Sequence, residues 1–279
     1  MARCFFVSDL HGDQARYDAL VAAIRRERPA AVFLGGDLLP HSLAAPAFFA
    51  EHLVLRFERL RRELGAAYPQ VFLIFGNDDP RSEEAAAQEA DRRGLWTYAH
   101  YRRAAWEGFD VVGYAYVPPT PFGLKDWERY DVSHYVEPGC SDPADGWRTA
   151  LTPQPETPRD TIREDLEHLA AGVDMERAIL LVHTPPYRTA LDRAALDGKS
   201  VDHAPVDVHV GSIAVRRFIE ARQPLLTLHG HVHESARLTG SWRERIGRTH
   251  AVSAAHDGPE LALVRFDPDD LEGATRELV

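Results

Sequence analysis

Five short blocks of polar residues, each directly following an apolar run, constrain the fold of this chain most. They are Asp9-Leu10-His11, Gly36-Asp37, Gly76-Asn77-Asp78-Asp79, Val182-His183-Thr184-Pro185-Pro186 and Gly230-His231-Val232-His233. Each apolar run is typical of a buried strand, so the polar side chains are expected to emerge together at one edge of a sheet. Carboxylates, an amide and imidazoles without a thiolate suit zinc, manganese or iron. The pattern predicts a site for two metal ions of the kind that hydrolases use.

Apolar runs and helical stripes alternate along the chain. Buried strands are expected near residues 3–8, 31–34, 71–75, 178–182 and 225–228, and helices at about 13–27, 44–66, 82–93 and 211–221. The 106–114 segment is typical of further antiparallel strands, and two short strands near 249–253 and 261–266 are expected to close a second sheet. This alternation predicts a layered α/β fold whose ligands sit on the loops after the strands.

The ordered blocks resemble the calcineurin-like metallophosphoesterase superfamily from residue 3 to about residue 254. The resemblance implies a four-layer α/β/β/α sandwich of two mixed sheets with flanking helices. It also implies two divalent metal ions, manganese, iron or zinc. One ion would be held by residues matching Asp9, His11 and His233, the other by residues matching Asn77, His183 and His231, with the carboxylate of Asp37 bridging both.

The resemblance further implies a mechanism. Two cations about 3.5 to 4 Å apart share one acidified water, hold the phosphoryl oxygens and offset the charge that develops during in-line attack. A hydroxide bridging the ions is then the nucleophile, so the absence of a serine or cysteine nucleophile motif is expected. The expected catalytic residues are Asp37, Asn77, Asp78 and His183.

The third block departs from the superfamily pattern. Many members have Gly-Asn-His-Asp or Gly-Asn-His-Glu there, and that imidazole protonates the leaving oxygen or steadies the transition state. This chain has Asp78 instead. Loss of the imidazole hurts most with poor leaving groups. Asp78 either acts as an acid, if crowding by Asp79 and Asp37 raises its pKa, or only faces solvent or adds an outer contact.

The missing imidazole favours one activity over others. Some bacterial and archaeal relatives that lack it prefer phosphodiesters in test reactions, and residues 211–235 resemble that branch. The leading hypothesis is therefore a phosphodiesterase acting on a small phosphodiester. The alternatives are a phosphomonoesterase or nucleotidase of the same fold, and a non-catalytic scaffold that retains the metal site.

Length and charge fit a single enzyme domain. The 279 residues are 44% hydrophobic and can bury a substantial core. Any cut between the first and last blocks would split the site, so one domain over residues 1–279 is expected. The formal charge of −11 argues against nucleic acid as a partner, because nonspecific affinity for it comes from Lys and Arg. A small phosphorylated substrate stays compatible, since bound metals dominate the local field.

Three further features of the sequence predict the cellular compartment of the protein. Only Cys4 and Cys140 are present, and both are expected to be reduced thiols. The first apolar run is too short for a signal peptide, and no run approaches the roughly 20 apolar residues of a membrane span. A cytoplasmic, soluble protein without a membrane partner is expected, and its oligomeric state is left open.

A segment rich in proline and aromatic residues, 116–158, interrupts the pattern. A disordered linker would carry few aromatic residues, so an ordered insertion is expected, and long ordered loops are often functional. It is either a lid or substrate-recognition flap, or a loop packed on the outside for stability. A second loop, 192–209, is expected to border the same cleft.

Several histidines lie outside the ligand pattern. His229 adjoins the last block and is expected to orient a ligand without binding metal itself. The others, including His41, are expected to be surface or structural residues. His209 begins a helix, where Gly211 and Ser212 either face a phosphate or only cap the helix.

Overall fold

The computed structural model describes residues 4–41, 45–151, 159–201 and 203–279. Parts of the expected first strand, the expected second helix and the insertion lie outside these ranges. None of the described helices combines the length and the apolar character that a bilayer crossing needs. The two described cysteines, Cys4 and Cys140, form no disulfide with each other.

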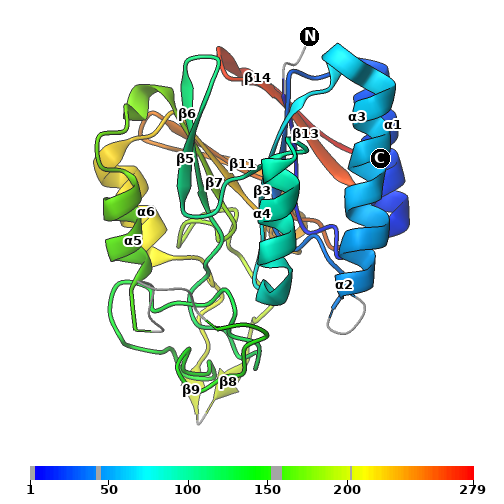
Figure 1. Ribbon diagram of the computed structural model, residues 1–279. Helices are drawn as coiled ribbons and strands as arrows, with labels where there is room; N and C mark the ends of the chain where they lie inside the picture. The colour runs from blue at the N-terminus through cyan, green and yellow to red at the C-terminus, as the bar shows by residue number, and fades with distance from the viewer. Residues whose placement is uncertain (1–3, 42–44, 152–158, 202) are drawn as a thin grey trace.

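Two six-stranded sheets form the centre of the molecule (Figure 1). The first has the order β14-β13-β1-β2-β3-β4. Its strands are β1 (Cys4–Val7), β2 (Ala31–Gly35), β3 (Gln70–Ile74), β4 (Thr97–Tyr98), β13 (Ala262–Asp267) and β14 (Asp270–Leu278). Strands β1 to β4 run parallel, and β13 and β14 are antiparallel additions at one edge.

The second sheet has the order β11-β12-β10-β7-β6-β5. Its strands are β5 (Arg102–Trp106), β6 (Phe109–Tyr114), β7 (Ala178–Val182), β10 (Leu226–His229), β11 (Arg243–Ile246) and β12 (Thr249–Ser253). The four central strands run parallel, and β5 and β11 are antiparallel edges. A separate two-stranded ribbon, β8 (Ser200–Val201) and β9 (Ala204–Pro205), projects from the second loop.

Helices cover the outer face of each sheet (Figure 1). The first sheet is flanked by α1 (Gln14–Glu27), α2 (Ala45–Phe48), the π-helix η2 (Phe49–Val54), α3 (Leu55–Leu64), the 3₁₀ turn η3 (Gly65–Ala67), η4 (Arg81–Glu83) and α4 (Glu84–Arg92). The second is flanked by α5 (Ile162–Leu169) and α6 (Ile213–Arg222). The remaining short helices are η5 (Met175–Arg177) and α7 (Ser235–Thr239). The expected α/β/β/α sandwich of two mixed sheets is confirmed.

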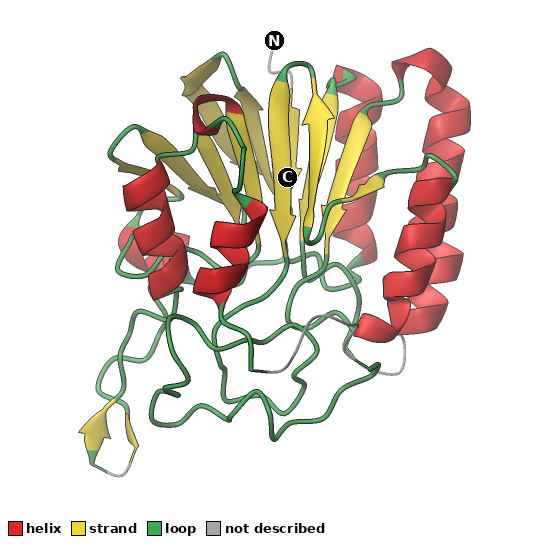
Figure 2. Ribbon diagram, turned by 60° about the vertical axis from the view of Figure 1, so that its left-hand side comes forward, coloured by secondary structure: helices red, strands yellow, loops and turns green. Residues whose placement is uncertain are grey.

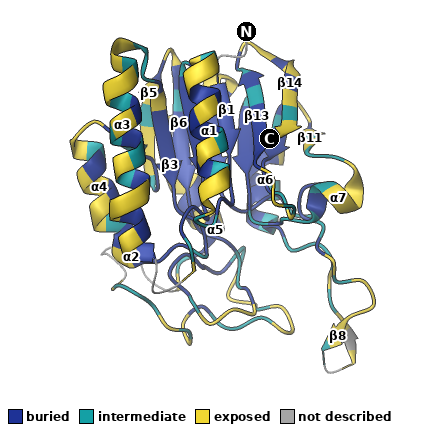
Figure 3. Cartoon of the chain, turned by 90° about the vertical axis from the view of Figure 1, so that its right-hand side faces the viewer, coloured by how far each residue is buried: buried dark blue, intermediate teal, exposed yellow. Residues whose placement is uncertain are grey.

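Alternation along the strands produces two apolar layers. In β1, Cys4 and Phe6 face the second sheet, whereas Phe5 and Val7 face the helices. Because side chains of a strand point to opposite faces in turn, a continuous apolar run is what a strand buried on both faces requires. Figure 3 shows the resulting pattern, with buried strands beneath helices that are exposed on their outer sides.

Most of the expected elements are present, with one error of placement. The sequence pattern assigns the 261–266 strand to the second sheet, but β13 pairs with β1 in the first, Phe6 opposite Val264. Its apolar run is compatible with either sheet, and the choice depends on long-range pairing that the local pattern does not encode. The expected helix over 44–66 contains the π-helical turn η2 and ends in a 3₁₀ turn.

The first part of the insertion is built into the body of the protein. Trp127 and Lys125 are fully buried, and Lys125 pairs with Glu128 at 2.6 Å. The Trp127 indole donates to the carbonyl of Asp79 at 2.8 Å, and the Asp126 carboxylate accepts from the backbone N–H of Arg81 at 2.8 Å. The root of the insertion is therefore a packed structural segment, tied to the loop of the third polar block.

A buried histidine beside this root gives the fold a pH-dependent stability. The Nδ1 of His100 accepts from the Ala115 N–H at 3.0 Å, and its Nε2 has no partner within the described residues. Burial, with the nearby charges of Arg81 and Arg129, holds the pKa of His100 well below its usual value. Below about pH 6.5 this histidine therefore binds a proton in the unfolded chain but stays neutral in the folded protein.

Unfolding of a His100→Asn variant should depend less steeply on pH than that of the wild type. Because the pKa of His100 is lower in the folded protein than in the unfolded chain, the folded state is most stable above the unfolded pKa. The free energy of unfolding then falls as pH falls, by up to about 1.4 kcal/mol per pH unit. Asparagine keeps an acceptor for Ala115 but does not titrate. Urea unfolding between pH 7.5 and 5 tests this, with His52→Asn, at an exposed histidine, as the control. Parallel curves for His100→Asn and the wild type would contradict it.

Candidate metal centre

The five polar blocks meet at one edge of the two sheets. Each follows the carboxyl end of a parallel strand: β1, β2 and β3 in the first sheet, β7 and β10 in the second. Figure 2 shows the loops after these strands gathered below both sheets. Parallel strands deliver their carboxyl ends to the same edge, so five segments distant in sequence share one site.

The first group of potential ligands contains Asp9, His11, Asp37 and His233. One ligand atom from each lies within 4.8 Å of the others. The two Nε2 atoms of His11 and His233 are 3.1 Å apart, and His233 Nε2 is 3.2 Å from Asp9 Oδ1. Four donor atoms this close together, from two sheets, form a convergent set that can hold one cation.

The second group contains Asp37, His183 and His231, again within 4.8 Å of one another. Asn77 adds an oxygen, because its Oδ1 lies 2.6 Å from His231 Nδ1 and 3.2 Å from His183 Nε2. The Asp37 Oδ2 is 3.3 Å from His183 Nε2. Asp37 is common to both groups and therefore occupies the position that a bridging carboxylate requires.

Strained backbone accompanies this convergence. Four of the seven expected ligands have a positive φ: Asp9 at 57°, His11 at 45°, Asp37 at 51° and His231 at 73°. Residues other than glycine adopt this region at a cost, and such strain concentrates at functional sites. The surrounding hydrogen bonds hold it in place: Asp9 N–H donates to the Gly36 carbonyl at 2.9 Å, and His11 N–H to that of Asp37 at 2.8 Å.

The donor atoms fit metal ions in two respects. The Asp9 Oδ2 is buried and has no hydrogen-bond partner among the described residues. The Nδ1 of His183 lies 2.7 Å from the Gly35 carbonyl and must donate to it, which leaves Nε2 as an acceptor that can bind metal in the neutral imidazole. An unpaired buried carboxylate oxygen and an imidazole nitrogen of fixed tautomer are groups that a cation would complete.

The electrostatics of the site also favour cations. Burial acts to raise the pKa of Asp37, but the imidazole of His183 outweighs it and holds that pKa well below the usual value. Burial acts to lower the pKa of His183, but the charge of Asp37 raises it to about 10. Burial also opposes protonation of His233, but the bond to Asp9 raises that pKa to about 9. The ionised carboxylates therefore draw positive charge to this edge.

Asp78 lies at the border of the centre. Its N–H donates to Asp37 Oδ1 at 2.8 Å, and its Oδ1 accepts from the Asn77 amide at 3.0 Å. Burial, and next the charge of Asp37, raise its pKa to about 6. The expected crowding by Asp79 is not the cause, because that carboxylate turns away and accepts from the N–H groups of Leu38, Leu39 and Gly76.

Sequence reasoning misses one residue of the site. His41 is expected to be a surface or structural residue, but its ring stacks on that of His11 with centroids 5.3 Å apart. Its Nδ1 is 3.6 Å from Asp78 Oδ2, and the His41 side chain is 69% exposed. The available signal is its distance from Asp37, since it lies four residues later on the same loop.

His229 points away from the expected ligands. Its Nδ1 lies 3.0 Å from the Val182 carbonyl and 2.9 Å from that of Thr184, so this nitrogen is the donor. The Nε2 accepts from the Thr227 hydroxyl at 2.8 Å. Burial lowers its pKa to about 4, so the ring is neutral near pH 7. His229 thus fixes the backbone on both sides of His183, a supporting position that agrees with the expectation.

The helix that begins after Gly211 is capped from within the protein. Ser212 Oγ accepts from the Val215 N–H at 3.0 Å, and the Asp131 carboxylate accepts from the N–H groups of Ile213 and Ala214. His209 contacts Asp192 at 2.8 Å. Of the two expected roles for Gly211 and Ser212, the structure has the capping role, since a carboxylate of the insertion occupies the place of an anion.

The comparisons with known proteins identify the family. A family model described as calcineurin-like phosphoesterase matches residues 2–235. The chain belongs to this family. The calcineurin-like phosphoesterases bind two divalent metals, and the two ligand groups that share Asp37 are candidates for holding them.

Solved structures support the fold of this phosphoesterase. The crystal structure of TT1561 from Thermus thermophilus is 18% identical, with a TM-score of 0.57 over 100% of this chain and 99% of that chain. A dimetal phosphatase from Danio rerio is 14% identical, with a TM-score of 0.52 over 95% of this chain and 93% of that chain. No curated protein matches the chain significantly.

Replacing Gly76 of this phosphoesterase by alanine should disrupt the metal centre without removing a ligand. A Cβ there would lie 2.6 Å from His183 Nε2 and closer still to Asp37 Oδ1, so one of these groups would have to move. We expect the metal content after reconstitution, measured by atomic emission, to fall well below that of the wild type. Gly240→Ala is the control for general destabilisation, because alanine is strained in the left-handed backbone there (φ 75°) but its Cβ meets nothing within 4 Å. Full metal content in Gly76→Ala would disprove this account.

Proposed function

We propose that this protein is a phosphodiesterase that hydrolyses a small phosphodiester with the aid of two divalent metal ions, manganese, iron or zinc. The observation that carries the proposal is the position of Asp37, which belongs to two separate groups of potential ligands. A carboxylate shared in this way is what a two-metal hydrolytic centre requires. Because the ligands come from both sheets, we also propose that residues 1–279 form a single domain.

The proposed ligand sets follow the two groups. Asp9, His11 and His233 would hold one ion, Asn77, His183 and His231 would hold the other, and Asp37 would serve both. When bound, the ions supply an acidified water as nucleophile and neutralise charge on the phosphoryl oxygens.

The chain's own contribution is to orient these ligands. The Asp78 N–H bond fixes one oxygen of Asp37, and the Gly35 carbonyl fixes the tautomer of His183. The His231 N–H donates to Asp9 Oδ1 at 2.9 Å and so links the two sides of the site. Such bonds hold the donor atoms in place before an ion binds.

The charge of Asp78 favours a phosphodiester over a phosphomonoester as the substrate. Near pH 7 a phosphomonoester carries close to two negative charges, whereas a diester carries one. The Asp78 carboxyl has a pKa of about 6 and is largely ionised at that pH, so it repels the more highly charged ester more strongly. At that position Asp78 also provides no imidazole to protonate the leaving group, which disfavours poor leaving groups in either class of ester. The repulsion is the effect that acts against monoesters.

Substitution of Asp37 tests the catalytic proposal. Manganese-loaded protein should hydrolyse bis-p-nitrophenyl phosphate faster than p-nitrophenyl phosphate. Asp37→Ala should lose at least about 10²-fold in kcat/KM, because transition-state stabilisation of this size is typical of a lost electrostatic group. Asp18→Ala, at an exposed surface ion pair, is the control and should behave as wild type. Equal rates for wild type and Asp37→Ala would refute a catalytic centre here.

Two substitutions of Asp78 separate its charge from its acidity. Asp78→Asn removes the repulsion and should raise monoester turnover relative to diester turnover. Asp78→His should in addition raise the turnover of a monoester with a poor leaving group, such as an alkyl phosphate, because an imidazole can protonate that leaving group. The ratio of kcat/KM for the two nitrophenyl esters measures the effect of charge, and the ratio for an alkyl phosphate and p-nitrophenyl phosphate measures the effect of protonation. An unchanged ratio in both variants would contradict the role assigned to Asp78.

A further inference from the structure

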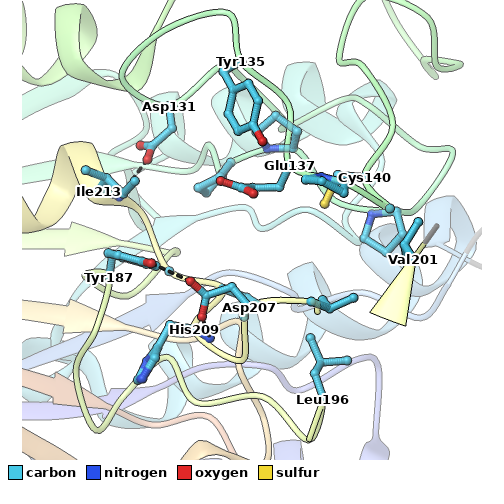
Figure 4. A pocket seen from close by; sticks show the side chains of 18 of the residues that line it. Asp131, Tyr135, Glu137, Cys140, Tyr187, Leu196, Val201, Asp207, His209 and Ile213 are labelled. Carbon is cyan, nitrogen blue, oxygen red and sulfur yellow. Dashed lines mark hydrogen bonds between the residues drawn. The ribbon is translucent and has the colours of Figure 1, made fainter. Parts of the chain in front are cut away.

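A pocket of about 510 Å³ lies between the insertion and the second loop. Figure 4 shows it with Tyr135, Glu137 and Cys140 on one side and Tyr187, Asp207 and Leu196 on the other. Most of its wall is apolar, with Pro118, Pro119 and Pro138 from the insertion and Leu196, Val201 and Val206 from the second loop. The two expected loops therefore border one cavity, which we call the apolar pocket.

The walls of the apolar pocket are held by specific contacts. The Tyr187 hydroxyl donates to Asp207 at 2.5 Å, and Asp131 joins the insertion to the first turn of α6 through Ile213 at 2.7 Å. Gly139 approaches the Val201 side chain so closely that a Cβ on the glycine would lie 3.0 Å from it. The insertion and the second loop thus touch at this end of the cavity, and Figure 4 shows Cys140 and Val201 there.

The apolar pocket is close to the candidate metal centre. Tyr187, which lines it, follows His183 by four residues, so their Cα atoms are no more than about 14 Å apart. The connecting segment is anchored, since the Tyr187 N–H donates to the Ser212 carbonyl at 3.0 Å. A substrate arm that follows this segment would lead from the metals to the wall of the pocket at Tyr187.

We propose that the apolar pocket binds the non-reacting arm of the phosphodiester, and that this arm is an uncharged aromatic group. The proposal rests on the proposed function. A volume of about 510 Å³ lies within the range of about 300 to 1,000 Å³ that is usual for small-molecule sites. Flat proline rings and the ring of Tyr135 can pack against an aromatic face. The lining also holds polar residues, among them Glu137, Lys199 and Asp207, but most of the wall is apolar, which favours an aromatic arm over a polyhydroxylated one.

Cys140 provides a readout that does not depend on hydrolysis. It lines the apolar pocket and is partly exposed, whereas Cys4 is fully buried, so alkylation should report on Cys140. Burial raises the pKa of the Cys140 thiol, so labelling with iodoacetamide is followed at pH 8.5 by mass spectrometry. Diphenyl phosphate should slow labelling at least fivefold, and dimethyl phosphate at the same concentration should not.

Substitutions in the pocket link this binding to catalysis. Leu196→Ser removes part of the apolar wall and should raise KM for bis-p-nitrophenyl phosphate about tenfold with little change in kcat. Val206→Trp fills the cavity and should raise KM by a similar factor. Leu151→Ser is the matched control, because Leu151 is 94% exposed and does not line the pocket. Both pocket variants should also lose the protection of Cys140 by diphenyl phosphate.

The outcomes separate the two proposals. Hydrolysis of the aryl diester without protection of Cys140, or with equal protection by dimethyl phosphate, overturns the pocket proposal and leaves the proposed function intact. Protection without hydrolysis of any ester by the metal-loaded protein refutes the proposed function, and with it the role of the pocket as a substrate site. Protection that Leu196→Ser and Val206→Trp abolish, together with the rise in KM, supports both.

Discussion

The packing of two sheets through one aromatic layer is the interaction on which the site depends. Phe33 and Phe72 stack with centroids 5.1 Å apart, and Trp106 meets Phe33 edge-on from the opposite sheet at 6.2 Å. This layer fixes the distance between the sheets and the alignment of their strands. The ends of β1, β2 and β3 consequently face those of β7 and β10, and residues separated by more than two hundred positions become neighbours. A shift of this layer would separate the two halves of the metal centre.

The same arrangement brings together groups whose burial or backbone conformation is unfavourable for folding. Three features of the site are each unfavourable for folding: the buried carboxylates, the unpaired Oδ2 of Asp9, and the left-handed backbone at Asp9, Asp37 and His231. Outer contacts hold them, among them the bonds of His229 to the carbonyls beside His183. The rigid scaffold therefore organises the donors before any ion binds. A bound cation would relieve part of this unfavourable free energy and so couple metal binding to stability.

Local sequence predicts the elements that depend on local chemistry. The strands that deliver the ligands and the convergence of the five blocks follow from apolar runs, turn residues and known ligand preferences. Features that depend on distant partners are not predictable in this way. There are three examples: the sheet that β13 joins, the position of His41 beside Asp78, and the contact of Asp131 with the N-terminus of α6. Each depends on a partner more than thirty residues away, or on a loop path that no periodicity encodes.

The buried root of the insertion has a consequence for how this architecture can diversify. Trp127 and Asp126 anchor the segment to the loop of the third block, while the stretch from Asp131 to Cys140 forms a wall of the apolar pocket. If the pocket accepts the substrate arm as proposed, recognition and chemistry belong to different parts of one connection. Exchange of residues along that wall would then alter which molecules are accepted, while the anchor and the candidate ligands behind it stay as they are. On this plan the preferred compound can change one substitution at a time without loss of the ligand set.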